Sequence, residues 1–99
     1  MSERVIRHAT IRGRVQGVGY RDWTRYVARE RGVEGWVRNR KDGSVEAVFA
    51  GSNEAVSGML AACRRGPPSS VIEAVEEREA AESELSLRGE KSFAILPTV

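Results

Sequence analysis

The sequence predicts an α/β (α+β) protein, a two-layer sandwich of helices packed on a β-sheet. Two observations lead to this prediction. Several stretches of the 99-residue chain alternate between apolar and polar residues, which is typical of half-buried strands. Two stretches between them instead repeat apolar residues every three or four positions, as amphipathic helices do.

The first alternating stretch, residues 5–15, predicts a strand. His8, the only histidine, falls on its polar side with no second histidine or cysteine nearby to share a metal ion, so we interpret it as a surface residue. A helix is predicted over residues 21–31, because apolar residues recur there at helical spacing and Gly32 stands where a helix C-cap belongs.

Residues 33–40 and 44–50 alternate again and predict two more strands. The Lys-Asp-Gly sequence at 41–43 has the chemistry of a tight turn, so these strands should form a hairpin. Residues 51–53 offer N-cap oxygens to a second helix, which the Gly-Pro-Pro sequence at 66–68 should end. The apolar stripe of this helix consists of Val56, Met59, Leu60 and Cys63.

Residues 71–75 predict a fourth strand, and residues 93–96 predict a short last one. Residues 76–90 hold six glutamates and few apolar residues, so we expect a loop or a frayed helical turn there. The order strand, helix, strand, strand, helix, strand predicts the ferredoxin-like βαββαβ arrangement, an antiparallel sheet with two helices on one face.

Length and composition predict one domain, residues 1–99. A chain of this size buries roughly 60–65% of its surface on folding, so it needs no disulfide or metal for stability. The single cysteine, Cys63, belongs to the predicted core, no apolar run approaches the roughly 20 residues of a membrane span, and residues 1–4 lack the apolar core of a signal peptide. We expect a cytoplasmic monomer that does not contact a membrane.

Charge is unevenly distributed along the chain. Residues 1–50 carry eleven Lys and Arg against six Asp and Glu, a net charge of +5, whereas residues 51–99 carry five against eight, a net charge of −3. A basic half can attract a small anionic substrate or a nucleic acid, and charge alone does not choose between them.

Residues 13–21 read Gly-Arg-Val-Gln-Gly-Val-Gly-Tyr-Arg and lie at the turn from the first strand to the first helix. Glycines let consecutive main-chain N–H groups point into one concave space, and the start of the helix adds its own N–H groups and the positive end of its dipole. Arg21 can bind two anionic oxygens with its planar guanidinium. This stretch predicts a phosphate-binding loop formed by Val15, Gln16, Gly17, Val18, Gly19, Tyr20 and Arg21. On this stretch alone, an ordinary glycine-rich turn with a solvated Arg21 remains the alternative.

Asn39 ends the second predicted strand, and the sheet order places it beside this loop. Its carboxamide both donates and accepts hydrogen bonds, which suits it to hold a water molecule. Alternatively, Asn39 is a structural residue at the end of a strand, and its side chain hydrogen-bonds to the main chain of its own turn.

Taken together, these two motifs resemble the acylphosphatase family, and the resemblance covers nearly the whole chain. The segments that carry it are residues 11–21 and 35–39, with Gly43, Val45, Gly51, residues 66–67 and residues 93–95 at matching distances. The resemblance implies a ferredoxin-like sandwich that hydrolyses acyl phosphates to a carboxylate and inorganic phosphate. It also implies that Arg21 binds the substrate phosphate and that Asn39 orients the attacking water.

The chain departs from the family pattern at two places. Tyr20 stands where the family usually has phenylalanine, which adds a hydroxyl to a packing position. Residues 96–99 lack the basic and aromatic ending common in the family, and we expect this difference to concern the sheet edge rather than the site.

The sequence shows no nucleophilic triad, metal cluster or carboxylate pair near the two motifs. An acyl phosphate expels a carboxylate whose conjugate acid has a pKa of roughly 4, so no general acid is needed. Catalysis then requires only that the site position the phosphoryl group and the attacking water and stabilise the charge on the phosphoryl oxygens. We therefore expect a metal-independent catalytic site without a cofactor.

Two other functions fit the same fold. A nucleic-acid-binding module would need exposed aromatic residues on the central strands, where the chain offers only Trp36 and Phe49. An accessory domain that binds an acyl phosphate within a larger maturation or transfer enzyme is also possible. Because the chain ends at Val99, a free-standing hydrolase is the preferred interpretation.

Overall fold

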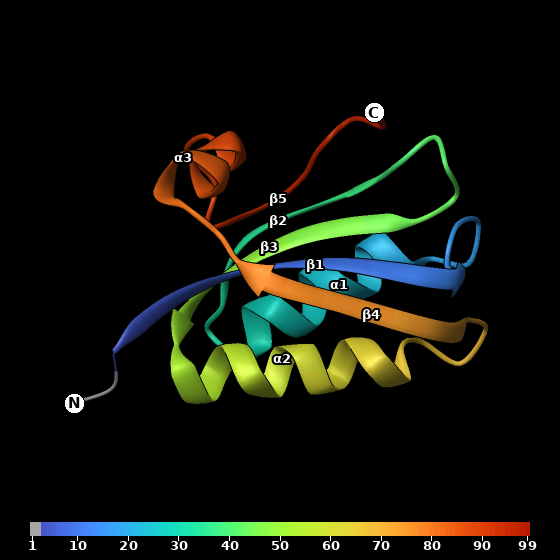
Figure 1. Ribbon diagram of the computed structural model, residues 1–99, viewed down its shortest axis with the longest axis horizontal. Coiled ribbons are helices and arrows are strands. Elements are labelled where there is room, and N and C mark those ends of the chain that lie inside the picture. The colour runs from blue at the N-terminus through green and yellow to red at the C-terminus, as the bar shows by residue number, and fades with distance from the viewer. Residues whose placement is uncertain (1–2) are drawn as a thin grey trace.

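The computed structural model describes residues 3–99, which form a five-stranded sheet with helices packed against it (Figure 1). The strands lie in the order β4-β1-β3-β2-β5. The elements are β1 (Arg4–Arg14), α1 (Tyr20–Glu30), β2 (Glu34–Asn39), β3 (Val45–Ser52), α2 (Asn53–Arg65), β4 (Val71–Glu79), α3 (Glu82–Leu85), the 3-10 turn η1 (Ser86–Arg88) and β5 (Phe93–Ile95). None of the helices within residues 3–99 is long and apolar enough to cross a membrane.

The topology is ferredoxin-like, as predicted. Strand β3 pairs antiparallel with both β1 and β2, and β4 pairs antiparallel with β1. The last strand differs from the predicted antiparallel sheet, because β5 pairs parallel with β2 and makes the sheet mixed. Since β1 and β2 both run opposite to β3, they run in the same direction and end at the same end of the sheet.

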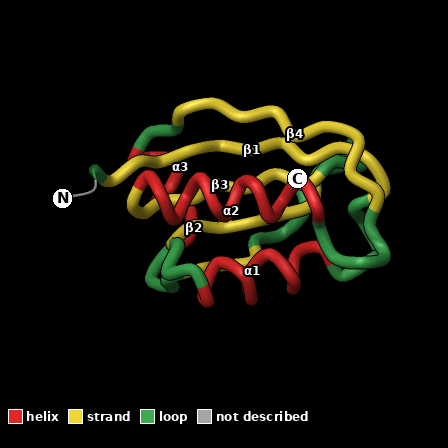
Figure 2. Tube along the Cα trace, turned by 90° about the horizontal axis from the view of Figure 1, so that it is seen from below, coloured by secondary structure: helices red, strands yellow, loops and turns green. Residues whose placement is uncertain are grey.

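Helices α1 and α2 lie side by side on one face of the sheet (Figure 2). Their predicted boundaries hold to within a residue, and the predicted end signals are in place. The Ser52 hydroxyl accepts a hydrogen bond from the Ala55 amide at the start of α2, and Gly66 ends this helix with a φ of 66°. All four residues of the predicted apolar stripe of α2 are buried, which confirms Cys63 as a core residue.

The prediction for residues 76–90 is wrong in part, because β4 continues to Glu79. This edge strand is mostly exposed on both sides and therefore shows no apolar alternation. Ion pairs, rather than an apolar face, connect this strand to its neighbours. The Glu76 carboxylate lies 2.9 Å from the guanidinium of Arg12 on β1, and the Glu77 carboxylate lies 2.6 Å from that of Arg64 on α2.

Helices are not confined to one face of the sheet. Within residues 76–90, the short helix α3 and η1 pack on the opposite face (Figure 1). A second small core forms there, in which Leu85 packs with Trp36, and the Trp36 indole N–H donates to the Glu84 carbonyl at 2.7 Å. Leu85 is the only buried leucine in this glutamate-rich segment, and one such residue does not predict that the segment packs on the sheet.

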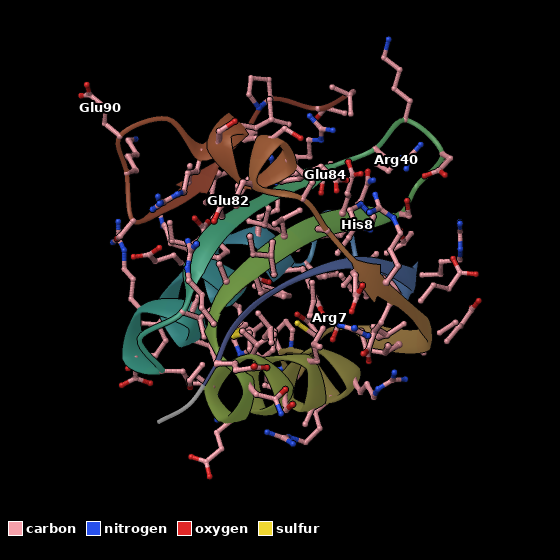
Figure 3. All side chains as sticks on the ribbon, turned by 60° about the vertical axis from the view of Figure 1, so that its left-hand side comes forward. Arg7, His8, Arg40, Glu82, Glu84 and Glu90 are labelled. Atoms are coloured by element: carbon pink, nitrogen blue, oxygen red, sulfur yellow. The ribbon has the colours of Figure 1, made fainter. Side chains whose placement is uncertain are left out.

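His8 is buried, so its interpretation as a surface residue is wrong. Its side chain is on the face of the sheet that carries α3, whereas its neighbour Arg7 points to the α2 side (Figure 3). The His8 Nε2 donates to Glu46 Oε2 at 2.7 Å, and the Arg38 Nε donates to Glu46 Oε1 at 2.7 Å. At His8 the polar side of β1 thus packs against the buried Glu46 carboxylate of β3 instead of facing solvent.

These contacts control the ionisation of Glu46. Burial raises the pKa of its carboxyl, but the hydrogen bonds from His8 and Arg38 outweigh burial and lower the pKa below its ordinary value of 4.5. A carboxyl whose pKa is lowered on folding stabilises the fold above its ordinary pKa. That stabilisation is lost as the pH falls through the lowered value.

We predict that Glu46→Gln lowers the free energy of unfolding at pH 7 by about 2 kcal/mol, because His8 and Arg38 lose a charged hydrogen-bond partner. The difference from the wild type should shrink below pH 4.5. Urea unfolding at pH 7 and at pH 3 measures both values. Glu76→Gln is the matched control, since this exposed carboxylate should contribute less than about 1 kcal/mol. An equal loss for Glu46→Gln at both pH values would contradict the account.

Candidate phosphate-binding site

The loop between β1 and α1 has the backbone shape of an anion-binding nest. Gly17 and Gly19 have φ angles of 73° and 79°, while Val18 between them does not have a positive φ. This alternation turns successive N–H groups toward one side of the chain. A Cβ at either glycine would meet no atom within 4 Å, so glycine is needed for the backbone angle and not for space.

The first turn of α1 extends this nest. Gly19 caps the helix and has no side chain to bond the first N–H groups, which leaves them available to an anion. Arg21 lies in this turn and is half-buried. Within residues 3–99 its guanidinium makes no hydrogen bond or ion pair. The helix dipole and this guanidinium favour a negative charge at the same place.

Asn39 reaches the same end and the same face of the sheet. It pairs with Val45, and Val45 also pairs with Ile11 on its other side, so one row across the sheet joins Asn39 to the strand that leads into the loop. Neighbouring strands lie about 4.8 Å apart, which puts Asn39 roughly 10 Å from Ile11 along this row. Like Val37 two residues earlier, Asn39 faces the side on which α1 packs.

The Asn39 side chain is not used by its own turn. Its Oδ1 is buried and has no hydrogen-bond partner within the described part of the chain. Asp42 holds the turn instead, because its carboxylate accepts from the Ser44 amide at 2.9 Å and from the Ser44 hydroxyl at 2.6 Å. An unpaired buried carbonyl costs about 1–3 kcal/mol, so a polar group in this position calls for an explanation.

Residues 96–99 lie at the sheet edge, as expected, but their main chain also touches the strand that carries Asn39. The Val99 amide donates to the Asn39 carbonyl at 3.2 Å, and the Lys41 amide donates to the Val99 carbonyl at 2.7 Å. These bonds continue the pairing of β5 with β2 and fix the backbone of Asn39 on the side away from β3.

Tyr20 fits its packing position despite its extra hydroxyl. Its ring is buried, and the hydroxyl donates to the Cys63 carbonyl at 2.9 Å, so α1 is tied to α2 directly beside Arg21. Burial raises the pKa of the Tyr20 hydroxyl far above its ordinary value and raises the pKa of the Cys63 thiol to about 12. Both side chains therefore stay uncharged, and Cys63 is not an activated nucleophile.

The loop is also held by two side-chain contacts that the sequence analysis did not identify. The Ser69 hydroxyl, in the segment after α2, donates to the Val18 carbonyl at 3.1 Å. On the other side, the Gln16 carboxamide donates to main-chain carbonyls of the β2–β3 turn. The type of residue at position 16 was the one available signal, since an amide in a glycine-rich loop offers two donors.

The structure thus brings together Arg21, Asn39 and the loop residues 15–20. All of them lie at the end of the sheet where β1 and β2 finish, on the face covered by α1. His8 lies on the opposite face and does not belong to this site.

Comparisons with known proteins support the family predicted from the sequence. The acylphosphatase family model matches residues 7–95. An acylphosphatase from Bradyrhizobium diazoefficiens is 58% identical over 98 residues, which cover 97% of this chain and 98% of the relative.

Solved structures agree with this match. The crystal structure of acylphosphatase from Bacillus subtilis is 34% identical and superposes with a TM-score of 0.81, covering 93% of this chain and 98% of that one. Full-length HypF in its phosphate- and nucleotide-bound form is 26% identical with a TM-score of 0.83, but the match covers 99% of this chain and only 12% of HypF. The chain therefore belongs to the acylphosphatase family.

Proposed function

We propose that this chain hydrolyses the carboxyl-phosphate bond of acyl phosphates, with Arg21 and Asn39 as the catalytic residues. The main-chain amides of residues 15–20 and the Arg21 guanidinium bind the phosphoryl group, and Asn39 orients the attacking water. The observation that carries the proposal is the buried Oδ1 of Asn39, which has no hydrogen-bond partner within residues 3–99. It lies on the same face and at the same end of the sheet as the nest and Arg21, whose guanidinium is unpaired within the described residues.

In this reaction the water oxygen forms a bond to phosphorus, while the bond between phosphorus and the carboxyl oxygen breaks. The bonding electrons leave with the carboxylate, which is stable without a proton at neutral pH because its conjugate acid has a pKa of roughly 4. The N–H groups and Arg21 stabilise negative charge on the equatorial phosphoryl oxygens. Asn39 Oδ1 accepts a hydrogen bond from the water and holds it in line with the leaving group.

We further propose that a phosphoryl oxygen accepts the proton that the water loses. The side chains near the site fit poorly as a base. His8 lies on the other face of the sheet, and the hydrogen bonds from Ser44 to Asp42 lower the pKa of that exposed carboxyl, which weakens it as a proton acceptor. The proposed reaction then requires neither a metal ion nor a cofactor.

The alternative functions find less support. Trp36 and Phe49, the aromatic residues that a nucleic-acid-binding sheet would have to expose, are both buried in the cores. The likeness to HypF fits an accessory domain, but this chain spans 98% of the length of its Bradyrhizobium relative. We therefore propose that residues 1–99 form a single acylphosphatase-like domain that is active by itself.

We also propose that the enzyme acts as a cytoplasmic monomer on a small acyl phosphate, without a nucleic-acid or membrane partner. Its one cysteine is buried and unpaired, which suits a reducing compartment. The loop, Arg21 and Asn39 all come from one chain, so the proposed site needs no second copy.

We predict that the purified protein releases inorganic phosphate from benzoyl phosphate, and that EDTA leaves the rate unchanged. The expectation follows from a site whose positive charge is supplied by amides and a guanidinium rather than by a metal ion. Initial rates with and without chelator measure it, corrected for spontaneous hydrolysis. A rate equal to the uncatalysed one would refute the function, and loss of activity with EDTA would refute metal independence.

Two variants should separate binding from turnover. Arg21→Ala is expected to weaken competitive inhibition by phosphate and to lower kcat/KM by about 1000-fold or more, because a charged donor to the phosphoryl oxygens is lost. Asn39→Ala should keep the inhibition constant for phosphate within about 3-fold and lower kcat by about 100-fold or more.

Arg25→Ala and Asn53→Ala serve as matched controls for these variants. Arg25 lies one turn further along α1 and pairs with Asp22, and Asn53 lies at the start of α2. Near-normal kcat for Asn39→Ala would contradict the water-orienting role, while unchanged phosphate inhibition for Arg21→Ala would contradict its role in binding.

A further inference from the structure

We propose that the Gln16 side chain is a positioning residue that sets the spacing between the phosphate-binding loop and Asn39. This inference rests on the proposed function and adds a role that the main-chain amide of Gln16 does not perform. A glutamine side chain in a phosphate-binding loop could donate hydrogen bonds to the anion. Here the Gln16 carboxamide instead donates to main-chain carbonyls of the neighbouring turn.

The contacts of Gln16 are short and converge on one turn. Its Nε2 donates to the Arg40 carbonyl at 2.7 Å and to the Ser44 carbonyl at 2.8 Å. These carbonyls stand on the two arms of the turn between β2 and β3, and the Arg40 amide donates across it to the same Ser44 carbonyl at 2.9 Å. Arg40 directly follows Asn39 in the chain, so Gln16 is fixed one residue away from the proposed water-orienting group.

The chemistry of these contacts requires a glutamine. A primary amide carries two N–H donors on one nitrogen, and both are used here. A glutamate would direct a negative oxygen at two carbonyl oxygens. An asparagine is one methylene shorter and would fall short of them from the same backbone position. Alanine would leave two part-buried carbonyls without these donors.

Gln16 also makes a connection that the sheet does not supply. Strands β1 and β2 are not neighbours, because β3 lies between them. The loop leaves the sheet after Arg14, so no ladder hydrogen bond holds residues 15–19 against the turn at 40–44. The Ser69 hydroxyl holds the loop through the Val18 carbonyl, and within residues 3–99 it makes no hydrogen bond to that turn.

The expected consequence is a loss of turnover more than of binding. The loop amides and Arg21 bind the phosphoryl group, whereas the Gln16 side chain donates to the Arg40 and Ser44 carbonyls of the turn. The water held by Asn39 must approach phosphorus in line, and a displacement of about 1 Å can cost roughly 100-fold in rate. Loosening the tie between loop and turn should therefore disturb the water more than the phosphate.

A double-mutant cycle with benzoyl phosphate tests this role. Gln16→Ala should lower kcat by about 30-fold or more, while the inhibition constant for phosphate changes by less than about 3-fold. In an Asn39→Ala background, the same substitution should lower kcat by less than about 3-fold, because the oriented water is already lost. Gln16→Glu keeps the length of the side chain without its donors and should behave like Gln16→Ala.

Ser69→Ala is the matched control, since it removes the other side-chain contact to the loop. Its effect on kcat should multiply with that of Asn39→Ala. If Gln16→Ala also lowers kcat by the same factor in both backgrounds, or weakens phosphate inhibition as much as it lowers kcat, the positioning role is wrong. An inactive wild type would instead refute the proposed function, and a fully active Asn39→Ala would refute the water-orienting role, so these failures are distinguishable from a failure of the positioning role.

Discussion

The site depends on one row of residues across the sheet. Val45 pairs with Asn39 on one side and with Ile11 on the other, because β3 runs opposite to both of its neighbours. This pairing puts the last residue of β2 level with Ile11, and β1 continues from there to Arg14, so the loop after β1 starts at the same end of the sheet as Asn39. A shift of one residue in the β2–β3 register would turn Asn39 to the opposite face.

The two faces of the sheet differ in what they carry. The face covered by α1 and α2 holds the larger core and carries the loop, Arg21 and Asn39 at its end. The other face holds a small core under α3 and the buried Glu46 with its hydrogen-bond partners His8 and Arg38. The side chain of Glu46 is close in sequence to the site but points away from it, so it stabilises the hairpin that carries Asn39 without taking part in the proposed reaction.

Most of the fold could be predicted from alternation, turn chemistry and helix ends. The Asp-Gly turn, the Ser52 cap and the glycine-rich loop are local signals, and each is where the sequence placed it. The errors concern residues whose environment is set by distant partners. His8 looked exposed because its burial depends on Glu46, which lies 38 residues away, and β4 looked irregular because ion pairs replace its apolar alternation.

The most direct test of the account is a titration of the 15N-labelled protein with inorganic phosphate, followed by NMR. The main-chain amides of residues 15–20, the Arg21 Nε–H and the Asn39 carboxamide should all shift with a single dissociation constant, because they surround one anion. The amides around His8 on the other face should not move. A titration that shifts the loop but leaves Asn39 unchanged, or that shifts the His8 face instead, would contradict a shared phosphoryl site.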